Sequence, residues 1–262
     1  MTTNWRSCPY PSVTAAAITV IFAVGALINR RRRSTRGSYQ LARAYSAYII
    51  REDDYVFSLA RVHALHVLSQ EERWGINFEL RVQSYILHSR PYLMTVLGKV
   101  YYSHIVVGAA FVVYCFTVLP PALFQSIRRT IAINNMIAFI MITCWRCMPP
   151  RLLPPDAWTQ NRFQLTIAAM PSLHFGTALF IGTCLSRFSP HRWVRWFSPL
   201  WPLLMFVTII ATANHFVLDA IIGATVPAMG WRINEAMLLF RPLEKWVFWL
   251  LRTERPTLSQ GP

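Results

Sequence analysis

The chain has 262 residues, of which 54% are hydrophobic and only 14% are charged, with a mean hydropathy of +0.34. Soluble domains carry about 25% charged residues, so this composition excludes an ordinary soluble domain and a disordered chain. The net charge of +15 comes mostly from arginines that lie between long apolar runs, an arrangement that suits anionic lipids or phosphorylated substrates and argues against nucleic acid as a partner.

An N-terminal membrane anchor is expected over residues 1–33. Residues 12–29 carry no charge and are followed directly by four arginines at 30–33. A helix that crosses a bilayer needs about 20 apolar residues. No basic segment precedes this run and no small-residue cleavage site follows it, so the pattern favours a first span over a cleaved signal peptide.

Residues 34–96 differ in kind from the rest of the chain. Arginines and most of the acidic residues alternate here with apolar side chains. This pattern is typical of amphipathic helices that lie on a membrane surface and do not cross it.

Residues 97–233 are predicted to form a membrane-embedded catalytic core. Together with the first span, their uncharged runs predict an all-α fold, a polytopic membrane helical bundle of about six spans. Arginines in the short loops place the site described below on the luminal or exterior side, and this conflicts with the cytosolic arginines at 30–33 if residues 34–96 do not cross. The uncharged runs are 100–119, 130–145, 163–186, 196–218 and 220–231.

Residues 234–262 are expected to form an interfacial helix and a tail. The stretch 234–251 is amphipathic, and Trp246 and Trp249 suit the boundary between lipid and water. The last residues are polar and rich in proline, as is typical of a disordered terminus.

Ionisable residues within spans are costly and therefore indicate function. His215 and Asp219 are four residues apart, so on a helix they would share one face. A carboxylate in that position can accept a hydrogen bond from one imidazole nitrogen, which fixes the tautomer and leaves the other nitrogen available to attack or to take a proton. A buried polar pair that merely joins two helices is the alternative reading.

Two further motifs can bind an anion. In Met170-Pro171-Ser172-Leu173-His174, a proline at a first helical position and Ser172 predict a helix start inside an apolar stretch, with His174 on the first turn. The N–H groups of such a start bind anions. The proline-rich run 149–155 would hold Arg151 at the membrane face, where a guanidinium suits phosphate. A simple helix cap and an ordinary flanking arginine are the alternatives.

The alternation of spans predicts that these motifs meet. The chain leaves one span at Arg151 and enters the next at Ser172 on the same side, and His215 lies where the chain has crossed away and returned. Two histidines beside a guanidinium and a helix N-terminus describe a phosphate site, in which one imidazole attacks phosphorus and the other protonates the leaving oxygen.

These motifs resemble those of the type 2 phosphatidate phosphatase superfamily, most closely the branch that contains the inositol-phosphorylceramide synthases. The resemblance covers roughly residues 70–230 and implies a helical bundle with a metal-independent phosphohistidine mechanism. It implies that His215 is the nucleophile, that Asp219 orients it and that His174 is the general acid. The same resemblance implies that Ser172 and Arg151 bind the phosphate. It rests on Pro149-Pro150-Arg151, Pro171-Ser172-Leu173-His174, His215-Phe216-Val217-Leu218-Asp219 with Gly223, and the stretches 72–79 and 101–104.

The chain departs from the family pattern at two usual cations. Cys144 stands where the first motif has a lysine, and Ile209 stands where the third has an arginine. Arg146, Arg162 or a surface-helix arginine would have to substitute, and these departures put hydrolysis of a simple phosphate ester in doubt.

Two residues of one predicted span are additional site candidates. His104 and Tyr101 are placed to contact a headgroup or an acceptor, or alternatively to form a hydrogen bond between helices. The five cysteines are odd in number and give no disulfide framework, and the spacing of Cys144 and Cys147 lacks the second pair that a zinc site needs.

The sequence therefore predicts an integral, multi-pass membrane enzyme, with the endoplasmic reticulum or Golgi as the candidate compartment. Its substrate would be a lipid phosphate or a prenyl diphosphate, and no cofactor, metal or nucleic acid is expected. A metal-independent isoprenoid-diphosphate hydrolase or terpene cyclase is one alternative, since Asp53-Asp54-Tyr55-Val56-Phe57 lacks the final acid of a metal-binding box. A non-enzymatic lipid-binding membrane protein is the other.

Overall fold

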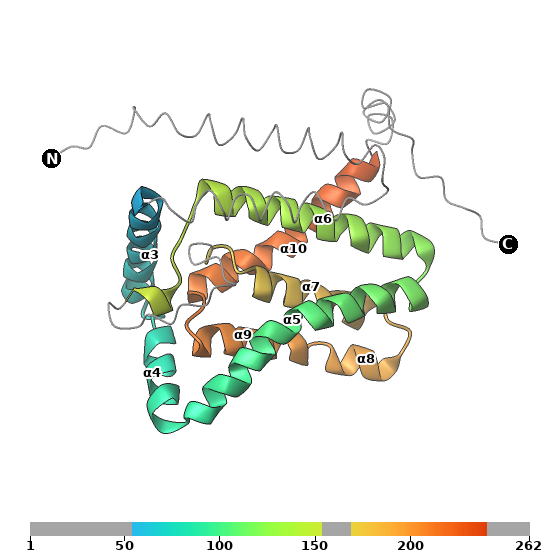
Figure 1. Ribbon diagram of the computed structural model, residues 1–262. Helices are drawn as coiled ribbons and strands as arrows, with labels where there is room; N and C mark the ends of the chain where they lie inside the picture. The colour runs from blue at the N-terminus through green and yellow to red at the C-terminus, as the bar shows by residue number, and fades with distance from the viewer. Residues whose placement is uncertain (1–53, 154–168, 240–262) are drawn as a thin grey trace. The chain divides into compact units, whose positions relative to one another are not determined.

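The computed structural model describes residues 54–153 and 169–239, which are helical and contain no β-strand (Figure 1). Apart from Asp54, these residues belong to one compact unit that covers 55–241. The predicted anchor at 1–33, the first part of the surface region and the C-terminal stretch from residue 240 lie outside the described residues. The all-helical prediction is confirmed for the described part of the chain.

The described part of the surface region contains two helices, α3 (Asp54–Trp74) and α4 (Glu79–Ser89). Gly75 ends α3 in the left-handed conformation, with φ of 69°, which glycine adopts without the steric cost of a Cβ atom. Its N–H donates to the Glu72 carbonyl at 3.1 Å, and the Ile76 N–H donates to the Glu71 carbonyl at 2.9 Å. This turn places the last residues of α3 next to the start of α4.

Three helical segments of the described chain are long and apolar enough to cross a membrane. They are α5 (Pro91–Val118), α6 (Pro121–Cys144), and the segment Arg192–Ala211, which comprises α8 (Arg192–Phe197) and α9 (Leu200–Ala211). Both α5 and α6 begin with proline, whose missing N–H is not needed at a first helical position. These segments indicate a membrane protein. The described residues do not show the six predicted spans.

The exposed surface of α5 fits a lipid environment. Between residues 105 and 116, four of its large apolar side chains are more than 60% exposed. A contiguous apolar surface of this kind is uncommon on a soluble monomer, and hydrocarbon solvates it without cost. The four residues are Ile105, Val106, Val113 and Phe116.

The helix boundaries differ from the predicted runs because uncharged composition does not show where backbone hydrogen bonding stops. Helix α5 begins at Pro91, before the uncharged run that starts at residue 100 and before the expected domain boundary at 96. Helix α7 (Leu173–Phe188) covers only the second part of its predicted run, and α10 (Val217–Leu239) extends beyond the predicted end at Trp231.

Helix α10 packs against α6 and α7, and α9 packs against α4, α5 and α7 (Figure 1). Glycines allow α7 and α10 to approach closely. A Cβ atom on Gly176 would lie 2.5 Å from the Gly223 carbonyl oxygen, and one on Gly223 would lie 2.5 Å from the Ser172 carbonyl oxygen. Small residues at such crossings are typical of helix packing in membranes, and this crossing brings the starts of α7 and α10 together.

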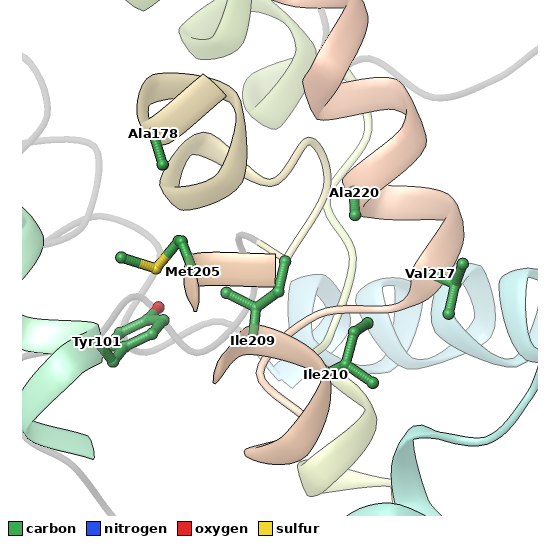
Figure 2. Close-up of a cluster of buried hydrophobic side chains, with 7 residues drawn as sticks. All are labelled: Tyr101, Ala178, Met205, Ile209, Ile210, Val217 and Ala220. Atoms are coloured by element: carbon green, nitrogen blue, oxygen red, sulfur yellow. The ribbon is translucent and has the colours of Figure 1, made fainter. Parts of the chain in front are cut away.

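A buried apolar cluster joins α9 to α5, α7 and α10 in the same region (Figure 2). Met205 and Ile209 of α9 are fully buried within it. Close packing gives these side chains defined positions, so α9 serves as the support on which the first turns of α7 and α10 rest. The cluster consists of Tyr101, Ala178, Met205, Ile209, Ile210, Val217 and Ala220.

Candidate active site

Backbone hydrogen bonds join the three predicted motifs, which are distant in sequence. They connect the segment after α6, the segment before α7 and the stretch that runs from the end of α9 into the first turn of α10. Because N–H and C=O groups buried in an apolar bundle need partners, these bonds fix the three segments relative to one another. The Ala169 N–H donates to the Cys147 carbonyl at 3.0 Å, the Arg151 N–H to the Ala213 carbonyl at 3.1 Å and the Ser172 N–H to the Asp219 carbonyl at 3.2 Å.

His215 lies in the turn before α10, and not on the same helix as Asp219 as its spacing suggested. The turn is tight, since Ala213 has a positive φ of 46°, a conformation that is costly for a residue with a Cβ atom. His215 is 4% exposed, and its Nδ1 lies 2.7 Å from the Ala169 carbonyl oxygen. A carbonyl oxygen only accepts, so Nδ1 carries the proton and Nε2 keeps a lone pair.

The expected arrangement of Asp219 is therefore corrected in one respect. Its Oδ2 lies 3.7 Å from His215 Nδ1, which is an ion-pair distance but longer than a hydrogen bond. The same oxygen accepts the Phe216 N–H at 3.0 Å. The Ala169 carbonyl thus sets the imidazole tautomer, while the fully buried Asp219 holds the turn and places a carboxylate beside the ring.

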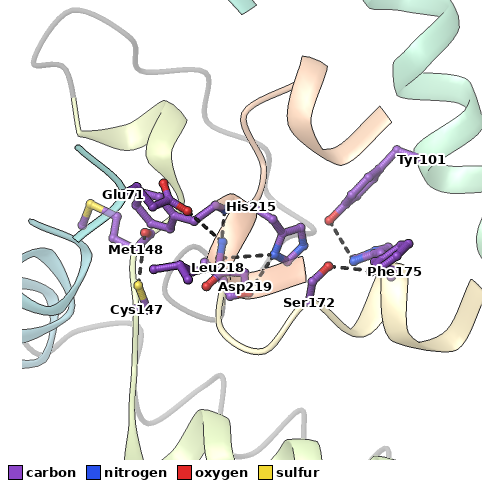
Figure 3. A network of polar contacts seen from close by, with 12 residues as sticks. Glu71, Tyr101, Cys147, Met148, Ser172, Phe175, His215, Leu218 and Asp219 are labelled. Carbon is purple, nitrogen blue, oxygen red and sulfur yellow. Dashed lines mark hydrogen bonds and ion pairs between the residues drawn. The ribbon is translucent and has the colours of Figure 1, made fainter. Parts of the chain in front are cut away.

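His174 lies on the first turn of α7, next to His215. The centroids of the two imidazole rings are 5.7 Å apart. The Tyr101 hydroxyl lies 3.2 Å from His174 Nδ1, and the ring centroids of these two residues are 4.0 Å apart (Figure 3). The ring of His104 lies 4.3 Å from that of His174. Helix α5 therefore contributes both additional candidates, Tyr101 and His104, to the surroundings of His174.

Ser172 is the N-cap of α7, and the helix itself begins at Leu173. Pro171 thus precedes the cap and does not occupy the first helical position that the sequence suggested. The Ser172 hydroxyl accepts the Phe175 N–H at 3.4 Å, and the residue is fully buried. The cap uses the Phe175 N–H, and the Gly176 N–H donates to the Ser172 carbonyl at 2.9 Å. The preceding N–H groups of the first turn, at Leu173 and His174, are the ones that can bind an anion.

Arg151 lies in the short 3₁₀ helix η1 (Pro150–Leu152) that follows α6. Burial lowers the pKa of the Arg151 guanidinium, and the proximity of Tyr101 and Tyr102 acts in the opposite direction. Arg151 is thus close to the tyrosine that contacts His174.

The two departures from the family pattern have clear positions. Ile209 is fully buried in the apolar cluster and contributes no charge, while Cys144 is exposed at the end of α6. The carbonyl of Arg146 lies 2.7 Å from His63 Nδ1 on α3. Arg162 lies outside the described residues.

Within residues 54–153 and 169–239, no group of three or more His, Cys, Asp or Glu side chains could hold a metal ion.

Two buried acids near the site were not expected from the sequence. Glu71 of α3 and Glu79 of α4 are 0% and 1% exposed. The Leu218 N–H, at the start of α10, donates to Glu71 Oε1 at 2.7 Å. Both acids lie in a region predicted to be a surface, where carboxylates are ordinarily solvated, so their charge pattern gave no signal of burial.

A family model described as the PAP2 superfamily matches residues 65–233, which include Arg151, Ser172, His174, His215 and Asp219. The search of curated proteins gave no match, and the search of solved structures gave none either.

Proposed function

The chain belongs to the PAP2 superfamily, and we propose that it is a membrane lipid phosphatase or phosphotransferase that acts through a phosphohistidine intermediate. Family membership indicates phosphatase or phosphotransferase chemistry. The observation that supports the finer proposal best is the position of His215, whose Nδ1–H is held by a carbonyl while its ring lies 5.7 Å from that of His174.

The first half of the reaction forms a phosphoenzyme. The lone pair of His215 Nε2 attacks phosphorus and forms a P–N bond, while the bond from phosphorus to the leaving oxygen breaks. His174 donates a proton to that oxygen. Tyr101 holds His174 by Nδ1, so the opposite nitrogen, Nε2, carries the transferred proton.

The second half releases the phosphoryl group. Water or an alcohol attacks phosphorus, His174 takes the proton of the attacking oxygen, and the P–N bond breaks to restore the His215 lone pair. Asp219 balances the positive charge of the imidazole while phosphorus is bound to it. Arg151, the Ser172 hydroxyl and the first N–H groups of α7 are the groups proposed to bind the phosphate oxygens.

Transfer to an alcohol is the reaction class of the inositol-phosphorylceramide synthase branch. Because the chain lacks the two usual cations of the family, the assay compares alcohol acceptors with water. The test is incubation of the purified protein with a panel of lipid phosphates and prenyl diphosphates, with and without alcohol acceptors, followed by mass spectrometry of the products. Release of inorganic phosphate or formation of a new phosphodiester supports the proposal. Release of diphosphate favours the isoprenoid alternative, and turnover of no substrate that the protein binds favours a lipid-binding protein.

EDTA separates the proposed route from a metal-dependent one. Because every group in the two steps belongs to the chain, we expect the rate to be unchanged when EDTA is added. A loss of activity that Mg²⁺ restores would contradict the mechanism.

A further inference from the structure

Glu71 and Glu79 form a buried acid pair that the steps above do not use. They lie on α3 and α4, and the Glu71 carboxyl contacts both Glu79 and the start of α10. Figure 3 shows Glu71 and Tyr101 on opposite sides of His215. In this view Glu71 thus lies away from Tyr101, on the far side of the turn that holds His215.

The carboxyls of Glu71 and Glu79 lie close enough to act on each other, and three of their four oxygens are buried and receive no hydrogen bond from a donor: Glu71 Oε2, Glu79 Oε1 and Glu79 Oε2. Two ionised carboxylates only accept hydrogen bonds, so a bond between them requires a proton on one of the two. Apart from the Leu218 N–H, no donor from the described residues reaches the carboxyl oxygens of this pair. One shared proton gives Glu71 Oε2 and one Glu79 oxygen a partner each.

The charge around the pair favours the same arrangement. Asp219 of α10, a third fully buried carboxyl, and the buried Cys147 of the segment after α6 are the other titratable groups that act on this site. Three ionised carboxylates at one buried point would repel one another strongly. Burial and Glu79 raise the pKa of Glu71 to about 9, against the opposing effect of the Leu218 N–H.

We propose that Glu71 is a positioning residue that acts in its protonated form, accepting the Leu218 N–H with one oxygen and donating its proton to Glu79 with the other. The two bonds connect α3 and α4 to the first turn of α10, which carries Asp219 and follows His215 directly. This inference rests on the proposed function in one respect, since the group that it positions is the proposed nucleophile.

The Glu71→Gln variant tests the protonated form directly. Its amide keeps both bonds, because the oxygen accepts from Leu218 and the NH₂ group donates to Glu79. We expect a kcat close to that of the wild-type protein near pH 7 and retained activity at alkaline pH, where loss of the shared proton inactivates the wild type. The Glu71→Ala variant leaves a buried N–H unpaired, so we expect kcat to fall about 10- to 100-fold with little change in KM.

The Glu72→Gln variant is the matched control, since Glu72 is the exposed neighbour of Glu71 on the same helix. It should leave kcat and the pH profile unchanged. A Glu71→Gln protein that is folded but as inactive as Glu71→Ala would overturn the proposal, because it would mean that Glu71 must be charged. An alkaline limb that is identical in the wild type and Glu71→Gln would also overturn it.

A measurement independent of turnover separates this inference from the proposed function. Infrared difference spectra of the whole protein near pH 7 should contain the C=O band of a protonated carboxyl that is absent from Glu71→Gln and present in Glu72→Gln. If that band is seen but no phosphate substrate is turned over, the acid pair stands and the proposed function fails. If the band is missing, the acid pair is wrong whatever the activity.

Discussion

Substitution of Gly223 by alanine is the sharpest test of how the site is assembled. The added Cβ atom would lie 2.5 Å from the Ser172 carbonyl oxygen, 3.1 Å from its carbon and 3.2 Å from the Ser172 nitrogen. All three are backbone atoms, so no side-chain rotation relieves the clash. Ordinary contact requires about 3.4 Å or more, and α10 must therefore move away from α7 by about 1 Å.

That movement acts directly on the proposed chemistry. It stretches the 3.2 Å hydrogen bond from the Ser172 N–H to the Asp219 carbonyl and separates the turn that holds His215 from the first turn of α7. A displacement of about 1 Å from reactive geometry costs about 100-fold in rate. Overpacking also destabilises a well-packed contact by about 1–3 kcal/mol.

The assay compares kcat and the melting temperature of Gly223→Ala with those of the wild-type protein and of Gly108→Ala. A Cβ atom on Gly108, within α5, meets no atom within 4 Å, and alanine is a better helix former by about 0.5–1 kcal/mol. We expect Gly108→Ala to keep full activity and unchanged or higher stability. A folded Gly223→Ala protein with wild-type kcat would refute the argument that the α7–α10 approach sets the positions of the catalytic groups.

Three further predictions concern individual side chains. His174→Ala and His215→Ala should each lower kcat about 10²–10⁴-fold, and full activity in either variant would remove that residue from the mechanism. Tyr101→Phe loses only the hydroxyl that lies 3.2 Å from His174 Nδ1, so kcat should fall about 2- to 10-fold, and an unchanged kcat would show that the hydroxyl does not orient the acid. The free energy of unfolding should depend on pH through Glu71, whose pKa of about 9 exceeds its ordinary value of 4.5. The stability that this carboxyl contributes is fully present below pH 4.5. It is lost as pH rises toward 9, by about 1.4 kcal/mol per pH unit. Melting curves of wild type and Glu71→Gln across that range measure this slope, and equal slopes for the two proteins would contradict it.

The convergence of the motifs follows from features that a sequence displays. Charged and proline-rich segments mark where spans end, and alternate crossings return the chain to the same side, so Arg151, Ser172 and His215 could be placed together without coordinates. The starts of α5 at Pro91 and α6 at Pro121 were not predicted, because uncharged runs were used to locate the spans, although a proline ring fixes φ and its missing N–H is tolerated at a helix start.

Other features depend on contacts between distant parts of the chain. The spacing of His215 and Asp219 suggested a shared helix, yet the turn around Ala213 places His215 before α10, where a carbonyl 46 residues away in sequence holds its ring. No periodicity encodes such a partner.

Glu71 and Glu79 illustrate a second reason. In a basic, amphipathic region an acidic residue is expected on the solvated face, and only the packing of α3 and α4 near the start of α10 reveals that these two are buried. The number of spans depends similarly on where helices end. The described residues contain three helical segments able to cross a membrane, whereas the six predicted spans were counted over the whole chain and include residues outside the described ones.

Detection of the phosphoenzyme tests the central claim most directly. The protein is mixed with a substrate labelled at phosphorus, quenched within a turnover under alkaline conditions that preserve phosphohistidine, and digested for mass spectrometry. The proposed mechanism predicts one labelled peptide, with phosphate on His215, that is absent from His215→Ala. Turnover that proceeds at the wild-type rate in His215→Ala, or a label on any other residue, would contradict it.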